Sequence, residues 1–97
     1  MPNTRRTPSA FEALGYAPEE AEHLRIRADL MIALGKLITE RGWTQAEAAR
    51  ALGVTQPRVS DLLRGKIDRF SIDTLVHLLS QVGAGVTFKV SRRRSAA

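Results

Sequence analysis

The stretch TQAEAARALGVTQPRVSDLLRGK, residues 44–66, decides the fold of this 97-residue chain. Thr44 and Glu47 form a T-x-x-E pattern, in which the threonine oxygen accepts from the Glu47 amide and the glutamate reaches back to the Thr44 amide. Apolar residues then recur at helical spacing up to Leu52. Gly53 can adopt the left-handed backbone that closes a helix. The stretch therefore opens with one short capped helix followed by a turn.

A second short helix is expected directly after this turn. Thr55 is suited to be its N-cap, since Val54 and Val59 have the spacing of a hydrophobic staple, and the following proline is tolerated in a first turn. Gly65 ends the helix. Two such helices at a wide angle form a helix-turn-helix, whose second helix has the dimensions to enter a DNA major groove. A solvated helix in a small bundle would show the same periodicity.

The remaining chain predicts a mainly α fold, a small helical bundle that contains the helix-turn-helix. A long helix is expected from Pro18 to Arg41, with one apolar stripe and a second apolar row, and a packing helix is expected from Ser71 to Gly83. The stripe contains Leu30, Ala33, Leu34, Leu37 and Ile38, and the second row contains Leu24, Ala28 and Met31. Residues 86–90, VTFKV, alternate with period two, which predicts a C-terminal β-strand that pairs with the same strand of a second copy or with another protein.

The expected domain organisation is a flexible N-terminal arm at 1–10, one domain at 11–90 with its motif at 44–66, and a basic flexible tail at 91–97. The 43% hydrophobic content supports a packed core, whereas 5% aromatic residues favour a core of aliphatic side chains. Zero cysteines exclude disulfides and thiolate metal sites. The chain lacks an apolar run long enough to span a membrane. It also lacks a catalytic or cofactor-binding motif. We therefore expect a cytoplasmic protein that is not an enzyme and needs no cofactor.

Basic charge is concentrated in the half that contains the motif. Residues 1–40 carry five basic and six acidic side chains, a net of −1, and residues 41–97 carry ten basic and four acidic, a net of +6. Positive charge beside a helix of groove-reading dimensions suits a polyanion, because neutralised phosphates release counterions. A merely basic soluble surface would have the same composition.

Residues typical of one repressor family occur throughout the motif, at Thr44–Gln45, Ala48–Ala49, Leu52–Gly53–Val54, Val59–Ser60 and Gly65–Lys66. This pattern resembles the helix-turn-helix of the Cro and phage-repressor (Xre-like) family. The longer run from Phe11 through the long helix to Lys89 resembles the small antitoxins of the host-inhibition-of-growth type.

The resemblance implies a DNA-binding surface that contains Gln45, Thr55, Gln56, Pro57, Arg58, Ser60, Asp61, Arg64 and Lys66. Gln45 is expected at a phosphate and Gln56 at a base edge, with adenine its natural bidentate partner. Pro57 offers only apolar contact, for example with a thymine methyl group.

The remaining roles on DNA are less specific. Arg58 and Ser60 are expected at phosphates or base edges, and Arg64 and Lys66 at the backbone. Asp61 has two alternatives, a cytosine amino group or an ion pair with Arg58 or Arg64.

These features predict a homodimeric transcriptional repressor that binds double-stranded DNA at an inverted-repeat operator. The antitoxin resemblance also implies a cognate toxin, a small messenger-RNA-cleaving protein whose operon the dimer represses. Contact with that partner is expected around Phe11 and Leu14, or on the helix face carrying Leu24 and Met31. The alternatives are a phage-type repressor without a toxin and a protein inhibitor whose DNA binding is secondary.

Overall fold

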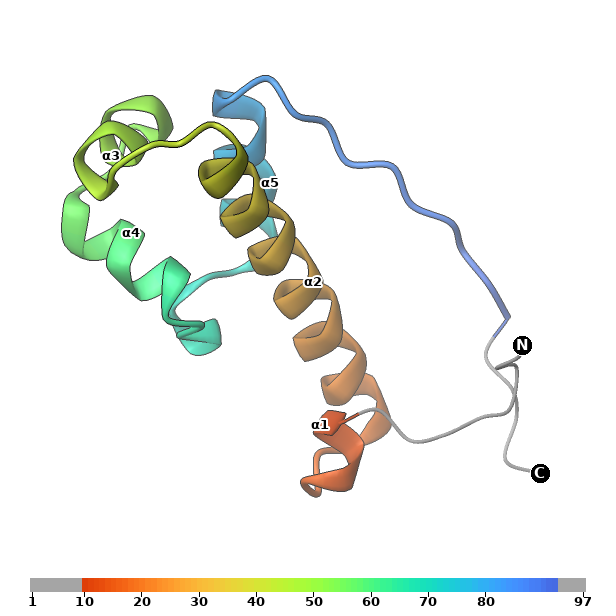
Figure 1. Cartoon of the computed structure of the whole chain (residues 1–97). Coiled ribbons are helices and arrows are strands. Elements are labelled where there is room, and N and C mark those ends of the chain that lie inside the picture. Colours follow the sequence, from red (N-terminus) through yellow and green to blue (C-terminus); the bar gives the residue numbers. More distant parts are fainter. Residues whose placement is uncertain (1–9, 93–97) are drawn as a thin grey trace.

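The computed structural model describes residues 10–92, which form a small helical bundle without a sheet in that range (Figure 1). Its elements are α1 (Ala10–Ala13), α2 (Pro18–Glu40), α3 (Gln45–Leu52), α4 (Gln56–Leu63), the 3-10 helix η1 (Ile67–Arg69) and α5 (Ile72–Gln81). The mainly α fold is thereby confirmed. The predicted N-terminal arm lies outside the described residues except for Ala10, and the predicted tail lies outside them beyond Arg92.

The long helix α2 is the element on which the others are assembled. Pro18 stands in its first turn, where a missing amide costs nothing, and Glu19 and Glu20 follow there, where acidic side chains favour the positive end of the helix dipole. The helix buries Ala21, Leu24, Met31, Leu34 and Ile38. The predicted pattern is wrong at Ala33, which is exposed, whereas Leu24 and Met31 of the second predicted row are buried as expected.

The core lies between α2 and the four shorter helical elements that follow it. Helix α5 packs against α2, and α3 packs against both α4 and α5. The largest fully buried side chains come from the four α-helices α2, α3, α4 and α5 and from the turn before α5: Phe70, Leu34, Leu52, Leu75 and Val59. The domain is therefore held together by aliphatic packing around one aromatic ring.

Trp43 fixes the connection between α2 and the motif. Its side chain is half-buried against the core, and the Arg41 guanidinium lies 5.2 Å from the centroid of its ring. Arg41 also donates a hydrogen bond of 3.1 Å to the carbonyl oxygen of Val82 at the end of α5. These contacts tie the end of α2 to both the motif and α5.

The predicted β-strand at residues 86–90 is not formed. This segment leaves α5 and runs alongside α2 as irregular chain (Figure 1). A strand requires hydrogen bonds to a neighbouring strand, and the described part of this protomer offers none. The period-two pattern alone therefore does not make a strand in the single chain.

No helix within residues 10–92 is both long enough and apolar enough to cross a membrane.

Candidate nucleic-acid interface

The start of α3 is fixed by the predicted capping box. The Glu47 amide donates to Thr44 Oγ1 over 3.1 Å, and the Thr44 amide donates to Glu47 Oε1 over 2.9 Å. Both bonds satisfy amides that have no partner within the helix. The helix then buries Ala48, Ala49 and Leu52. The orientation of its exposed first residue, Gln45, is thus set by the cap and by the core.

The turn between α3 and α4 also follows the sequence prediction. Gly53 has φ 73° and ψ 32°, the left-handed conformation that costs a residue with a side chain more than it costs glycine. Thr55 is the N-cap of α4, where its side chain accepts from the Arg58 amide at 3.4 Å. Val59 is buried and Val54 packs against the core, as the predicted staple requires.

Helix α4 separates its core face from an open face. Val59 and Leu62 are buried, whereas Leu63, predicted to join them, is 43% exposed beside α2. The predicted DNA-binding residues occupy the rest of the motif surface. Gln45, Thr55, Gln56, Pro57 and Arg64 are exposed, while Ser60 and Lys66 are half-buried. The described structure gives the side chains of Gln45, Gln56, Arg64 and Lys66 no hydrogen bond or ion pair. Those four groups are available to an external ligand.

Arg58, one of the predicted DNA contacts, is already engaged within the protein. Its Nη1 donates to the carbonyl oxygen of Arg69 over 2.8 Å. Its guanidinium carbon also lies 4.1 Å from the centroid of the buried Phe70 ring, an arrangement typical of a cation–π contact. A DNA contact by this guanidinium would compete with these two interactions.

Asp61 forms an ion pair that the sequence did not predict. Its Oδ2 accepts from Arg69 Nη1 at 3.0 Å, so its partner comes from η1 and not from Arg58 or Arg64 on its own helix. Arg69 thereby contacts α4 through both its side chain and its carbonyl oxygen. Helical spacing identifies only partners three or four residues away, and Arg69 is eight residues from Asp61.

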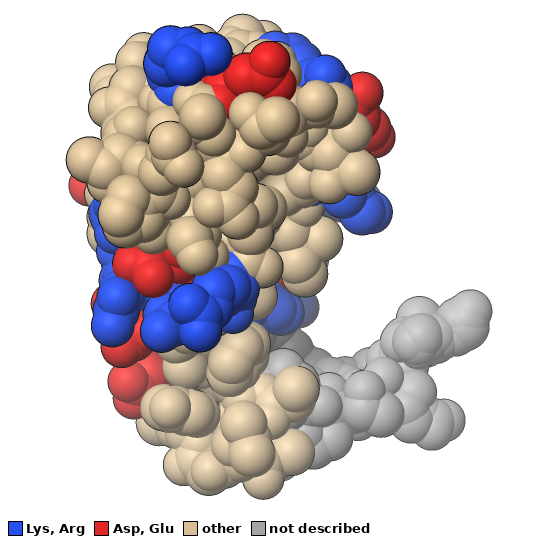
Figure 2. Space-filling view, turned by 60° about the vertical axis from the view of Figure 1, so that its left-hand side comes forward, with Lys and Arg blue, Asp and Glu red and all other residues tan. Residues whose placement is uncertain are grey.

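Charge on the motif side is distributed around an uncharged surface. Figure 2, in which the side of the molecule with α3 and α4 comes forward, shows Lys and Arg in separate patches at the edges of a broad area without charged groups. Acidic side chains stand next to some of these patches. Such an arrangement allows hydrogen bonding and apolar contact at the centre and phosphate contact at the margins.

No metal site accompanies this surface in the part of the chain that the structure describes. Histidine, aspartate and glutamate side chains do not gather there in groups of three or more that could hold an ion. The available chemistry is hydrogen bonding, cationic charge and apolar contact.

The capped helices, the glycine turn and the open face of α4 define a helix-turn-helix protein. The family model described as "Helix-turn-helix domain" matches residues 14–91, and the chain belongs to this family. Among solved structures, the chain is similar to a protein assigned provisionally to the XRE family of transcriptional regulators. The two share 33% sequence identity with a TM-score of 0.71, over 80% of this chain and 91% of that one. No curated protein matches at the significance required.

Proposed function

We propose that the protein is a sequence-specific DNA-binding transcriptional repressor in which α4 enters the major groove. The observation that carries this proposal is the open face of α4, which presents Gln56 without any intramolecular partner beside exposed Pro57 and half-buried Ser60. Membership of the helix-turn-helix family and the likeness to an XRE-family regulator support the same function.

The open side chains divide into base-reading and backbone-binding groups. Gln56, at the first position of α4, reads a base edge, and its amide is suited to two hydrogen bonds with adenine. Pro57 packs against a thymine methyl group, and Ser60 bonds to a base edge or a phosphate. Gln45, at the first position of α3, binds a phosphate together with the helix amides.

The remaining backbone contacts lie at the ends of α4. Arg64 and Lys66, at its C-terminal end, clamp the DNA backbone on one side. Thr55, which caps the helix, has its exposed side chain near the other end.

Arg58 and Asp61 have a different task in this proposal. Through Phe70 and Arg69 they hold α4 against the segment before α5, which fixes the angle of the reading helix. Arg58 reaches DNA only if it releases the Arg69 carbonyl, and Asp61 reads a cytosine only if it releases the Arg69 guanidinium.

The operator is an inverted repeat bound by a homodimer, with the two α4 helices about 34 Å apart. The test is a binding titration of the protein with the duplex upstream of its own gene and with a scrambled duplex, each at several salt concentrations. Tight binding to the native duplex alone, with a steep salt slope and two protomers per site, is expected. Equal weak binding to both duplexes would refute the repressor.

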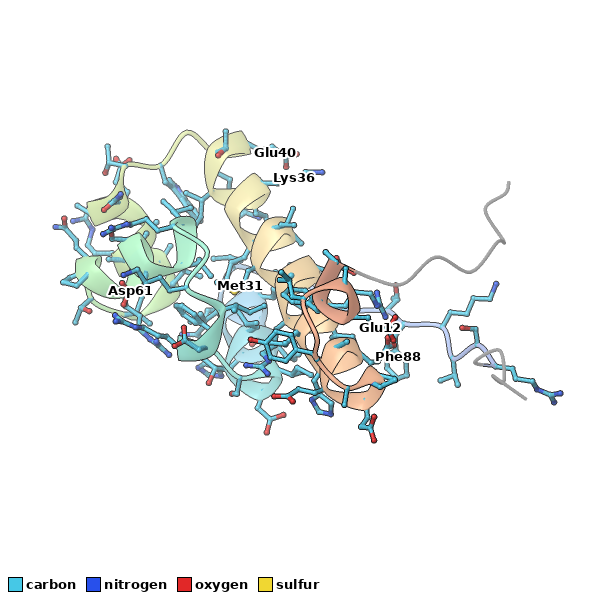
Figure 3. The ribbon with its side chains drawn as sticks, turned by 90° about the horizontal axis from the view of Figure 1, so that it is seen from below. Glu12, Met31, Lys36, Glu40, Asp61 and Phe88 are labelled. Atoms are coloured by element: carbon cyan, nitrogen blue, oxygen red, sulfur yellow. The ribbon has the colours of Figure 1, made fainter. Side chains whose placement is uncertain are left out.

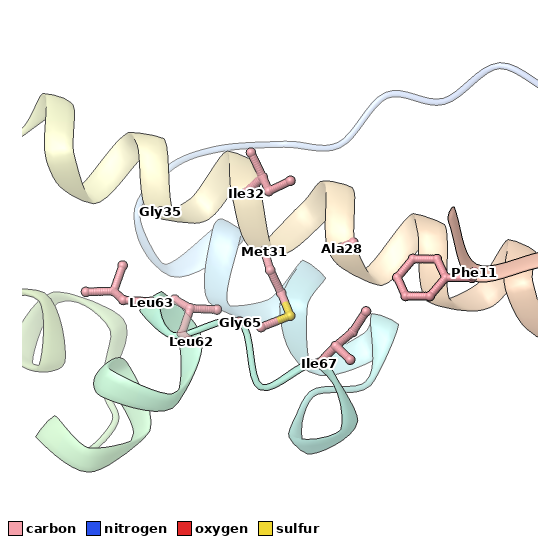
Figure 4. A pocket seen from close by; sticks show the side chains of 9 residues that line it. All are labelled: Phe11, Ala28, Met31, Ile32, Gly35, Leu62, Leu63, Gly65 and Ile67. Atoms are coloured by element: carbon pink, nitrogen blue, oxygen red, sulfur yellow. The ribbon is translucent and has the colours of Figure 1, made fainter. Parts of the chain in front are cut away.

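A second role, the neutralisation of a cognate toxin, is supported by the antitoxin resemblance and by an apolar groove beside α2. This groove of about 380 Å³ lies between α1, α2 and the end of α4. Figure 4 shows the side chains that line it, with Phe11 at one end and Leu63 toward the other. Ile32 is 58% exposed there, so apolar surface remains uncovered. Of the alternative predicted contact face, Met31 lines this groove but is largely buried, and Leu24 is buried and does not line it.

Deletion of residues 1–17 separates this second role from DNA binding. The deletion removes Phe11 and Leu14 but leaves α3 and α4 intact. We expect it to weaken binding to the protein encoded by the adjacent gene while the affinity for the upstream duplex is kept. Unchanged affinity for that protein would exclude the α1 side of the groove. If the adjacent genes are of phage origin, the alternative repressor without a toxin is favoured.

A further inference from the structure

The C-terminal segment, residues 85–92, leaves an apolar groove open between itself and the helices. The groove has a volume of about 900 Å³, and its helical walls include Ile26, Leu30, Ile72 and Val76. The segment itself forms the opposite wall. Val76 is 41% exposed, and Phe88 and Val90 on the segment are 85% and 87% exposed. A protomer on its own therefore leaves two facing apolar surfaces in contact with water.

The backbone of the same segment is also without partners. None of its amide or carbonyl groups forms a backbone hydrogen bond with another described residue, and the last such bond along the chain is from Ala84 to Leu79. An extended segment of this kind is a template for strand addition. Period two places Val86, Phe88 and Val90 on one side, and Thr87 and Lys89 on the other.

We propose that the occupant of this groove is the C-terminal segment of a second copy, which pairs antiparallel with the first across a two-fold axis at Phe88. In this register Phe88 lies opposite Phe88 of the second copy, and Val86 lies opposite Val90. The two segments form a ribbon with six apolar side chains on one face. That face covers the walls formed by α2 and α5 of both protomers. The proposal gives the homodimer put forward above a specific interface.

Charge around the groove favours this occupant. Its α2 rim carries Glu22, Arg25 and Asp29, a net of −1, in which Arg25 bonds to both carboxylates. The hydrogen bond to Glu22 raises the pKa of Arg25, so this residue stays protonated. The incoming segment carries Lys89 and Arg92 and no acidic residue. A basic strand therefore meets a rim of net negative charge, which favours the encounter of the two copies in this orientation.

The position of the interface leaves α4 free for DNA, and the area that a stable dimer needs is a small part of the protomer surface. Figure 3 shows Phe88 and Asp61, a residue of α4, on opposite sides of the bundle, so pairing through Phe88 leaves the face of α4 open. A stable interface needs about 800 Å² per partner. That is about 12% of the 6886 Å² that the protomer exposes.

The absence of cysteine from the chain allows a test by disulfide formation. Phe88→Cys places two thiols opposite each other on the two-fold axis, so oxidation is expected to give a covalent dimer. Val86→Cys and Val90→Cys alone place their thiols more than about 10 Å apart and are expected to remain uncrosslinked. The double variant Val86→Cys/Val90→Cys is expected to crosslink. Crosslinking by a single cysteine at 86 or 90, but not at 88, would overturn the proposed register.

Sedimentation of the unmodified chain and two charge variants tests the same interface without cysteine. The wild type is expected to sediment as a dimer at a protomer concentration on the order of 10 micromolar. Phe88→Asp is expected to weaken dimerisation on the order of 100-fold, because each dimer loses two central side chains. Thr87→Asp adds the same charge on the other side of the ribbon, opposite Lys89 of the second copy, and is expected to remain dimeric. A monomeric wild type, or equal dimerisation of the two variants, would overturn the proposal.

These measurements contain no DNA, so their outcome is independent of the repressor. If the Phe88→Cys dimer forms but binds the upstream duplex no better than the scrambled one, the interface stands and the repressor fails. If the wild type is monomeric yet discriminates between the duplexes, the repressor stands and the interface fails.

Discussion

Replacement of Arg58 by alanine distinguishes an internal brace from a DNA contact. The substitution removes the 2.8 Å hydrogen bond to the Arg69 carbonyl and the stacking of the guanidinium 4.1 Å from the Phe70 ring. A half-exposed hydrogen bond from a charged donor contributes about 1 kcal/mol to the free energy of unfolding, and the cation–π contact contributes about 0.5 to 1 kcal/mol. We therefore expect a loss of about 1.5 to 2 kcal/mol, or roughly 10 °C in Tm for a domain of this size.

The assay is urea unfolding followed by circular dichroism at one fixed protomer concentration, because dimerisation makes the midpoint depend on concentration. Arg64→Ala is the matched control. Arg64 is exposed and has no hydrogen bond or ion pair within the described chain, so its removal is expected to change stability by less than about 0.5 kcal/mol. Arg58→Lys keeps the charge but loses the planar stack, and its stability is expected to lie between those of wild type and Arg58→Ala.

DNA affinity measured on the same variants completes the comparison. Arg64→Ala is expected to weaken binding to every duplex, whereas Arg58→Ala acts mainly through stability. The reasoning would be refuted if Arg58→Ala unfolded within about 0.5 kcal/mol of wild type and lost discrimination at a single base pair. Arg58 would then be a base-reading residue whose observed contacts are not important for the fold.

Four other substitutions give separate outcomes. Thr44→Ala removes the cap of α3 and is expected to cost about 1 kcal/mol in urea unfolding, whereas Thr44→Ser is expected to restore stability. Gly53→Ala, at φ 73° and with its Cβ 3.3 Å from Gln81 Nε2, is expected to cost about 1 to 2 kcal/mol, whereas Gly85→Ala, with nothing within 4 Å, is expected to be neutral. Lys66→Ala is expected to weaken binding to all duplexes alike and to reduce the salt slope by about 1 per protomer; a loss confined to the native duplex would contradict a phosphate contact. Asp61→Asn breaks the exposed pair with Arg69, so we expect a loss of less than about 1 kcal/mol in stability and tighter binding to random DNA; weaker random binding would contradict this role.

Local sequence patterns predicted the motif because its structure depends on near neighbours. The capping box joins Thr44 to Glu47 and the turn depends on one glycine, so both could be read from the chain. The same holds for Ser71, whose side chain accepts from the Thr74 amide at 3.1 Å. Each of these features is set by an interaction within three residues along the sequence.

Contacts between elements could not be predicted in the same way. Arg69 pairs with Asp61 and receives a hydrogen bond from Arg58 only because η1 returns the chain to α4. The exposure of Ala33 depends on which face of α2 receives α5. The strand at residues 86–90 requires a partner backbone that the protomer does not supply. The sequence was therefore informative on caps, turns and periodicity, and uninformative where two distant segments decide a contact.

The central claim, that α4 reads bases, is tested most directly by comparing Gln56→Ala with Gln45→Ala. Both substitutions remove an exposed glutamine from the first position of a motif helix, so the chemical change is the same. Affinities are measured for the native operator, for operators with single base-pair changes, and for random DNA. We expect Gln56→Ala to cost about 1 to 3 kcal/mol on the native operator and to abolish preference at one base pair. Gln45→Ala is expected to weaken all duplexes equally. Equal losses on native and random DNA from Gln56→Ala would contradict base reading by α4.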